Sequence, residues 1–158
     1  MGAQRSWRDE PGLAAWSAFL RAHAAAVRRV DVEVGRRAGL PLAWYDVLLE
    51  LNAAPDRRLR MQDLGEATVL SRTRVSRIVD ELVVAGLVRR DPNPDDRRSA
   101  FATITGEGRT RLRRAAPVYL DAIRTHFVAA LDPRQIDIVE AAMSAVLHHE
   151  TPTPPPAE

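Results

Sequence analysis

The stretch SRTRVSRIVDELVVAGLVRRDPNPDDRRSAFATIT, residues 71 to 105, decides the fold of this chain. Its first half spaces apolar residues three and four positions apart, and this spacing predicts one buried stripe on a helix. Ser71 is a suitable N-cap, and Gly86 suits the end of the helix because glycine accepts the left-handed conformation there. The stripe consists of Val75, Ile78, Val79, Leu82 and Val83.

The opposite face of this predicted helix carries arginine and hydroxyl side chains. Arg74 and Arg77 lie three residues apart and therefore share one side of the helix. The planar fork of arginine matches the two acceptors on a guanine edge, and hydroxyl groups bind a base or a phosphate. Taken alone, such a helix is more often an ordinary solvated surface. The candidate DNA-binding residues on it are Ser71, Arg72, Thr73, Arg74, Ser76 and Arg77.

The residues after Gly86 predict a β-hairpin with a projecting loop. A short strand begins over residues 87–90, and two prolines within residues 91–96 end regular structure because they lack backbone donors. Residues 100–104 alternate in character, with Phe101 on the opposite side from Ala102. We expect a small β-wing beside the helix.

Arginines lie close to the tip of this predicted hairpin. Arg97 and Arg98 follow the loop, and an arginine there can enter a narrow minor groove without a base-specific hydrogen bond. Asp96 can orient Arg98 through a charge-assisted pair. The alternative is an ordinary surface salt bridge of small energy. We include Asp96, Arg97 and Arg98 among the candidate DNA-binding residues.

In their order and spacing, these segments resemble the MarR family of bacterial winged helix-turn-helix regulators. The similarity spans roughly Leu13 to His149. The family's wing carries an Asp-x-Arg signature, which falls here on Asp96 and Arg98, so the resemblance implies that Arg98 reaches the minor groove. The matching segments are Leu70-Ser71-Arg72, Val79-Asp80-x-Leu82, Gly86-Leu87-Val88-x-Arg90, Asp95-Asp96-Arg97-Arg98 and Thr103-Ile104-Thr105-x-x-Gly108.

The resemblance and the helical spacing elsewhere predict a mainly α fold with a small β-wing. It comprises a winged helix-turn-helix domain plus N- and C-terminal dimerisation helices. Helices are expected at 13–38, 42–53, 61–68 and from 106 to about 131, and Leu59-Arg60 is expected to add a third strand. Pro117 should bend the helix in which it lies, and Asp132-Pro133 is a start signal for a last helix ending near Glu150.

The expected domain organisation is a single domain over residues 13–150. Within it, residues 13–38 and 106–150 form the dimerisation helices, and residues 42–105 form the winged helix-turn-helix. We expect residues 1–12 to be a flexible N-terminus and residues 151–158, TPTPPPAE, to be a disordered tail.

Composition limits the function further. The 158 residues are 46% hydrophobic, which suffices for one core, and no membrane span or signal peptide is visible, so a cytoplasmic protein is expected. Cysteine is absent, which excludes disulfides, thiol-bound metals and cysteine redox switches. Ten arginines and seven acidic residues fall between Arg57 and Arg98, so the positive excess lies in the predicted DNA-binding part.

An enzyme is not expected. The four histidines form no catalytic or metal-binding pattern, and the chain has neither a glycine-rich phosphate loop nor a nucleophile elbow. We therefore predict no catalytic residue, cofactor or metal. A winged helix that binds a protein instead of DNA is the alternative, and the arginines of the predicted reading helix argue against it.

The expected partners are double-stranded DNA, a second copy of the chain and a small molecule. The resemblance implies a homodimer, which fits a palindromic operator and a repressor. It also implies a small aromatic or anionic ligand that binds between the dimerisation helices and the winged domain. Plain core packing is the alternative for each candidate ligand-binding residue. These are Trp16, Phe19, His23, Trp44 and Tyr45.

Overall fold

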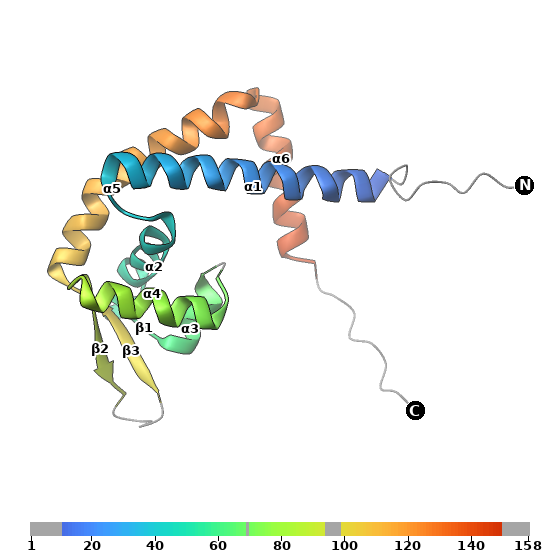
Figure 1. Cartoon of the computed structure of the whole chain (residues 1–158). Helices are drawn as coiled ribbons and strands as arrows, with labels where there is room; N and C mark the ends of the chain where they lie inside the picture. The colour runs from blue at the N-terminus through green and yellow to red at the C-terminus, as the bar shows by residue number, and fades with distance from the viewer. Residues whose placement is uncertain (1–10, 69, 94–98, 150–158) are drawn as a thin grey trace, which may run out of the picture.

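The structure is a computed structural model that describes residues 11–68, 70–93 and 99–149. Its helices are α1 (Pro11–Ala38), α2 (Leu42–Ala53), α3 (Met61–Ala67), α4 (Arg72–Val84), α5 (Gly106–His126) and α6 (Pro133–Leu147). The strands are β1 (Arg58–Arg60), β2 (Val88–Pro92) and β3 (Ala100–Ile104), and 3-10 turns lie at Pro55–Arg57 and Val128–Ala130. The mainly helical fold with a β-wing is confirmed (Figure 1). The expected disordered tail lies outside the described residues, as does most of the expected flexible N-terminus.

The three strands form an antiparallel sheet in the order β1-β3-β2. The predicted third strand is therefore present, and it pairs with β3 so that Leu59 lies opposite Ala102. Side chains from α2, α3 and α4 pack on the inner face of this sheet and form the main core with the first part of α5. The fully buried members include Leu48, Leu51, Leu64, Val79, Leu82 and Ala102.

Both ends of α4 follow the sequence-based expectation. Ser71 is the N-cap, and its hydroxyl oxygen accepts the backbone N–H of Arg74 at 3.4 Å. At the other end Gly86 has a φ of +72°, the left-handed conformation that glycine tolerates. The N–H groups of Gly86 and Leu87 then donate to the carbonyl oxygens of Val83 and Leu82, which closes the helix.

The start of α5 packs tightly against the exit of α4. Thr105 is the N-cap of α5, and its oxygen accepts the backbone N–H of Gly108 at 3.0 Å. A Cβ atom placed on Gly108 would lie only 2.2 Å from the carbonyl oxygen of Leu87 and 2.8 Å from Ile104. Glycine is therefore required at this position because there is no space for a side chain, and not because of its φ angle.

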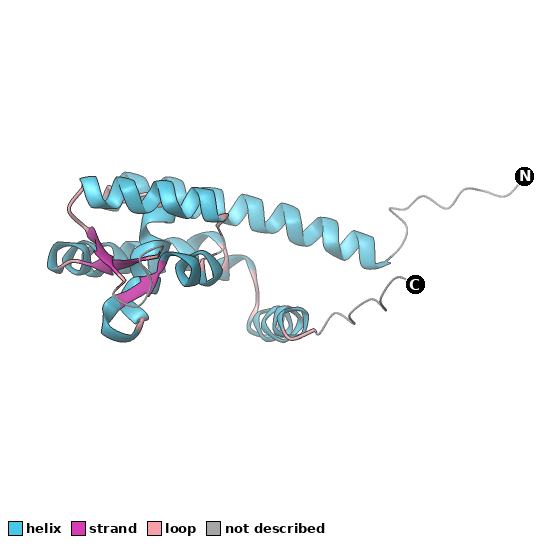
Figure 2. Ribbon diagram, turned by 90° about the horizontal axis from the view of Figure 1, so that it is seen from below, coloured by secondary structure: helices cyan, strands magenta, loops and turns pink. Residues whose placement is uncertain are grey.

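The N- and C-terminal helices, α1 and α6, lie away from the β-sheet (Figure 1). Helix α1 runs beside α5, and its N-terminal half projects beyond the winged domain (Figures 1 and 2). Helix α5 changes direction along its length and contains Pro117. It ends at His126, earlier than expected, because a 3-10 turn follows. Asp132 and Gln135 form a capping box for α6, as the start signal predicted.

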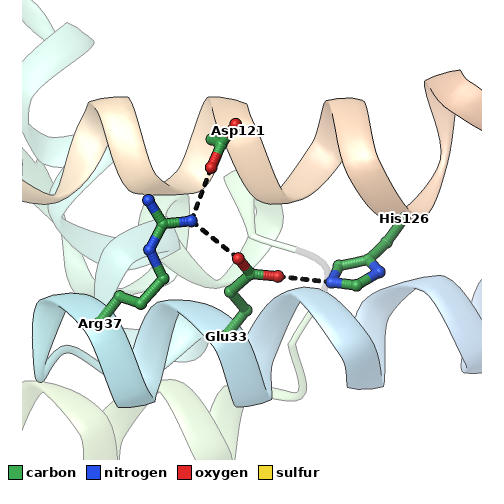
Figure 3. A network of polar contacts seen from close by, with 4 residues as sticks. All are labelled: Glu33, Arg37, Asp121 and His126. Carbon is green, nitrogen blue, oxygen red and sulfur yellow. Dashed lines mark hydrogen bonds and ion pairs between the residues drawn. The ribbon is translucent and has the colours of Figure 1, made fainter.

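A polar network joins α1 to α5 (Figure 3). Arg37 donates to Glu33 at 2.7 Å and to Asp121 at 2.6 Å, and Glu33 also pairs with the His126 Nε2 at 2.6 Å. The hydrogen bond from Arg37 and the contact with His126 lower the pKa of Glu33, and Arg37 likewise lowers the pKa of Asp121. The network fixes the two helices beside the small apolar cluster of Val30, Val34 and Ala122.

Within the described residues, no helix combines the length and the hydropathy needed to cross a lipid bilayer.

We predict that Gly108→Ala lowers the free energy of unfolding by about 1–3 kcal/mol, because the new methyl group meets a backbone carbonyl that cannot rotate away. Gly106→Ala is the matched control, since nothing lies within 4 Å of its Cβ position in the same helix. Urea unfolding at one fixed protein concentration measures both variants. Equal stability of the two variants would contradict the packing argument.

Candidate nucleic-acid interface

The face of α4 that points away from the core carries the predicted reading residues. Val75 and Val79 are buried, whereas Thr73 and Arg77 lie on the opposite side of the helix, and Arg77 is 79% exposed. Arg74 is exposed beside them, and Ser76 is partly buried at the edge of the face. The side chain of Arg72 lies outside the described part of the structure. Arginine and hydroxyl groups are thus presented together from one helical surface.

Two polar contacts hold α4 from its two flanks. On one flank, the Trp44 indole N–H from α2 donates to Glu81 at 3.0 Å. On the other flank, Arg90 from β2 donates to Asp80 at 2.7 Å. Asp80 and Glu81 are adjacent in the sequence and therefore point about 100° apart around the helix. The buried stripe of α4 sets the rotation of the helix about its own axis, and these two contacts add to it from both flanks.

Arg77 is connected to one of these contacts. Its Nε lies 3.3 Å from Glu81 Oε1, while the other oxygen of the same carboxylate accepts the Trp44 indole N–H. The half-buried indole of Trp44 holds the Glu81 carboxylate in place, and this carboxylate in turn positions the Arg77 guanidinium. The exposed ion pair itself contributes little stability. The arrangement orients Arg77 before any ligand arrives.

The wing is stabilised at its base by side-chain hydrogen bonds. Asp91 on β2 accepts the Thr103 hydroxyl at 2.7 Å and the Arg89 Nε at 2.9 Å. The bond from Thr103 and then the bond from Arg89 lower the pKa of Asp91. Asn93 donates to the Ser99 hydroxyl at 2.7 Å, which links the two ends of the wing loop. The predicted tip residues Asp96, Arg97 and Arg98 lie outside the described residues.

The structure also shows basic residues that were not among the predicted DNA-binding residues. Arg58 and Arg60 on β1 lie over the ring of Phe101, with guanidinium carbons 4.7 and 6.0 Å from its centroid. The signal in the sequence was the Arg-Leu-Arg alternation of this strand, since a strand that turns Leu59 toward the core turns its two neighbours outward.

The five predicted ligand-binding residues do not share one cavity. An apolar cavity of about 570 Å³ lies between α1, α5 and α6, and Phe19 and His23 contribute to its lining. Trp16 is adjacent, with its ring 5.8 Å from that of Phe19. Trp44 instead contacts α4, and Tyr45 is buried in the main core against Tyr119. The cavity lining also includes Tyr119, Ile123, Phe127, Val139 and Met143.

No group of three or more histidine, cysteine or acidic side chains is arranged to hold a metal ion in the described part of the chain. His126 is instead paired with Glu33, and the His148 ring contacts the carbonyl oxygen of Ser144 at 2.7 Å.

Comparison with known proteins places this geometry in a family. The MarR family sequence model matches residues 38–99. The chain is similar to the MarR family regulator Sco3205 of Streptomyces coelicolor, solved in complex with DNA. The two are 32% identical over 98% of this chain and 97% of that one, with a TM-score of 0.82.

Two further proteins are related at lower identity. The regulator AbsC of Streptomyces coelicolor is 28% identical, with 92% of this chain and 97% of that one covered and a TM-score of 0.79. An uncharacterized protein of Mycobacterium tuberculosis is 26% identical over 124 residues, which is 78% of this chain and 84% of that protein. The chain belongs to the MarR family of DNA-binding transcriptional regulators, which is a family of regulators and not of enzymes.

Proposed function

We propose that the protein is a homodimeric repressor that reads a palindromic operator in duplex DNA with α4 and the wing. The observation that carries the proposal is the exposed face of α4, where Arg74 and Arg77 stand clear of the core beside hydroxyl groups. Such a face suits base edges in the major groove. A similar regulator that was solved on DNA supports the same use of this domain.

The dimer is supported by apolar side chains on α1 and α6 that the described part of the chain leaves exposed. Helix α6 has no buried residue, and its Ile138, Val146 and Leu147 are all more than half exposed. On α1, Trp16 and Phe19 are exposed near the apolar cavity between α1, α5 and α6. A second copy that covers these residues would remove their apolar surface from water, which favours association.

A two-fold dimer determines the form of the DNA site. Two copies of α4 related by such an axis meet two half-sites of opposite direction about one helical turn apart, so the operator should be an imperfect palindrome. The proposed contacts comprise the helix residues Ser71, Arg72, Thr73, Arg74, Ser76 and Arg77 and the wing residues Asp96, Arg97 and Arg98. Occupation of a promoter by such a dimer blocks polymerase, and for this reason we propose repression.

Release by a small aromatic ligand is a further part of the proposal. The lining of the cavity between α1, α5 and α6 is almost wholly apolar, which favours an aromatic ring over a purely anionic group. His23 stands at this cavity with its ring stacked on Phe19 at 6.0 Å, and it offers a polar contact for a carboxylate. A ligand there releases DNA only if it binds the released state of the dimer more tightly than the bound state.

Selection of preferred duplexes from a random library tests the repressor model. We expect an imperfect palindrome that binds two protein chains, and Arg74→Ala or Arg77→Ala should weaken its binding by about 1–3 kcal/mol if each arginine reads a guanine. Fluorescence anisotropy gives the affinity, and light scattering of the complex gives the stoichiometry. A module that binds protein instead would be indifferent to DNA sequence and salt, and that result would rule the repressor out.

The contact between Trp44 and Glu81 should sharpen the choice of operator. Trp44→Phe keeps an aromatic ring on α2 but removes the hydrogen bond, which is worth about 0.5–1.5 kcal/mol. We expect the ratio of non-specific to operator dissociation constants to fall by about 2- to 10-fold, while non-specific affinity stays constant.

Glu81→Gln separates charge from orientation in the same experiment. The amide can still accept the indole N–H but no longer attracts Arg77. Because a negative charge is removed, non-specific affinity for DNA should rise, while the ratio of non-specific to operator dissociation constants should fall. If both variants keep the discrimination of the parent, Glu81 does not orient Arg77.

Fluorescence of Trp16 can report on the proposed ligand site. We expect a subset of small aromatic acids to quench this fluorescence and to weaken operator binding by about 5- to 150-fold, the usual range of allosteric coupling. Trp16→Phe is the control and should lose the quenching but keep the effect on DNA. Quenching that survives in Trp16→Phe, or an inert panel of acids, argues against this site.

A further inference from the structure

The outer face of the wing sheet is a basic surface that is separate from the reading face of α4. The register places Arg58 of β1 and Arg89 of β2 on the two sides of Thr103, and it places Arg60 opposite Phe101. These residues alternate with Leu59, Ala102 and Ile104, which face the core. We call Arg58, Arg60, Arg89, Phe101 and Thr103 the outer wing face; its three arginines are exposed, Phe101 is partly buried and Thr103 is buried.

The charge on this face is only partly compensated. Arg89 is paired with Asp91 at 2.9 Å, whereas Arg58 lies 3.7 Å from the exposed carboxylate of Asp56. Arg60 is exposed, and its described contact is with the ring of Phe101. The three exposed arginines, counted against Asp91 and Asp56, leave a surplus of one positive charge.

Phe101 orders two of these guanidinium groups. The guanidinium carbons of Arg58 and Arg60 lie 4.7 and 6.0 Å from its ring centroid, distances at which a cation is attracted to the face of the ring. An arginine held against a ring still presents the N–H groups at its edge to a partner. Because the side chains are already ordered, binding costs less conformational entropy.

We propose that the outer wing face binds phosphates of the DNA that flanks each half-site. The proposal rests on the DNA binding proposed above and extends it to residues outside α4 and the wing tip. Two observations favour DNA as the occupant. The charge of the face is complementary to phosphate, and its residues lie on β1 and on the strands β2 and β3 that carry the wing loop. Arginine matches phosphate oxygens in a two-pronged contact.

A structural role is the alternative that the experiment must exclude. Strand β1 is at the edge of the sheet, and charged side chains on an edge strand also prevent pairing with other chains. In that role the arginines would affect solubility and leave the salt dependence of DNA binding unchanged. Phosphate contacts, in contrast, release counterions and therefore change this dependence directly.

The test compares Arg58→Gln, Arg60→Gln and the double variant with the parent protein. The probe is the palindromic duplex from the selection experiment, extended by about one helical turn on each side, and affinity is measured between about 50 and 200 mM salt. Each substitution removes one arginine from each chain of the dimer. For every arginine removed from a chain, the slope of log affinity against log salt should become shallower by about one unit. On a duplex trimmed to the palindrome, the variants and the parent should bind equally.

Arg134→Gln at the start of α6 is the matched control, because it removes the same charge from the opposite end of the molecule (Figure 1). Its slope should equal that of the parent. Phe101→Leu keeps both charges and should retain the slope while binding weakens about 2- to 5-fold. Thermal unfolding verifies that each variant is folded.

The outcomes separate this proposal from the proposed function. If the parent selects no duplex, the repressor model itself fails. If the parent binds its palindrome but Arg58→Gln and Arg60→Gln keep the slope of the parent on the extended duplex, the outer wing face does not bind DNA and the proposal is wrong. Equal slopes for Arg134→Gln and the double variant lead to the same conclusion.

Discussion

The carbonyl group of Leu87 is the point on which the arrangement of the winged domain depends. Its oxygen accepts the backbone N–H of Thr105 at 3.0 Å, and the Thr105 hydroxyl lies 3.1 Å away. Gly108 packs against the same oxygen so closely that no side chain fits. Since α4 ends, β2 begins and α5 begins around this one peptide group, a single junction sets the directions of the reading helix, the wing and the connection to the terminal helices.

This junction makes the winged domain and the first part of α5 behave as one body. Further along, Arg37 and Glu33 of α1 bind Asp121 and His126 of α5, and Arg111 donates to the carbonyl oxygen of Gly39 at 2.8 Å. A change in the direction of α5 must therefore carry α4 and α1 with it. In a dimer, the spacing of two reading helices would follow from how the terminal helices pack, because the end of α4 is joined directly to the start of α5 at Leu87.

Local sequence signals predicted the elements well, because each depends on residues close in the chain. Ser71 and Gly86 mark the ends of α4 through backbone hydrogen bonds within a few residues, and Asp132 does the same for α6. The contact between Trp44 and Glu81 was not predicted, since it joins residues that are 37 positions apart. Tyr45 was predicted to bind a ligand because aromatic residues suit both a pocket and a core; it packs in the main core against Tyr119, and its part in ligand binding stays a prediction.

The charged residues of the winged domain contribute in different ways on α4 and on the outer wing face. On α4, the carboxylates of Asp80 and Glu81 lower the positive charge of the face proposed to bind DNA. Asp80 is bound by Arg90, and Glu81 contacts both Trp44 and Arg77. That arrangement lowers the general attraction to phosphate but positions the side chains of α4. Discrimination between bases depends on this positioning. On the outer wing face the ring of Phe101 contacts Arg58 and Arg60 without cancelling charge, and Asp56 and Asp91 compensate the face only in part. An acid in place of Phe101 would order these arginines equally well but would cancel the attraction to phosphate. An aromatic residue at this position is therefore compatible with the proposed binding of phosphate.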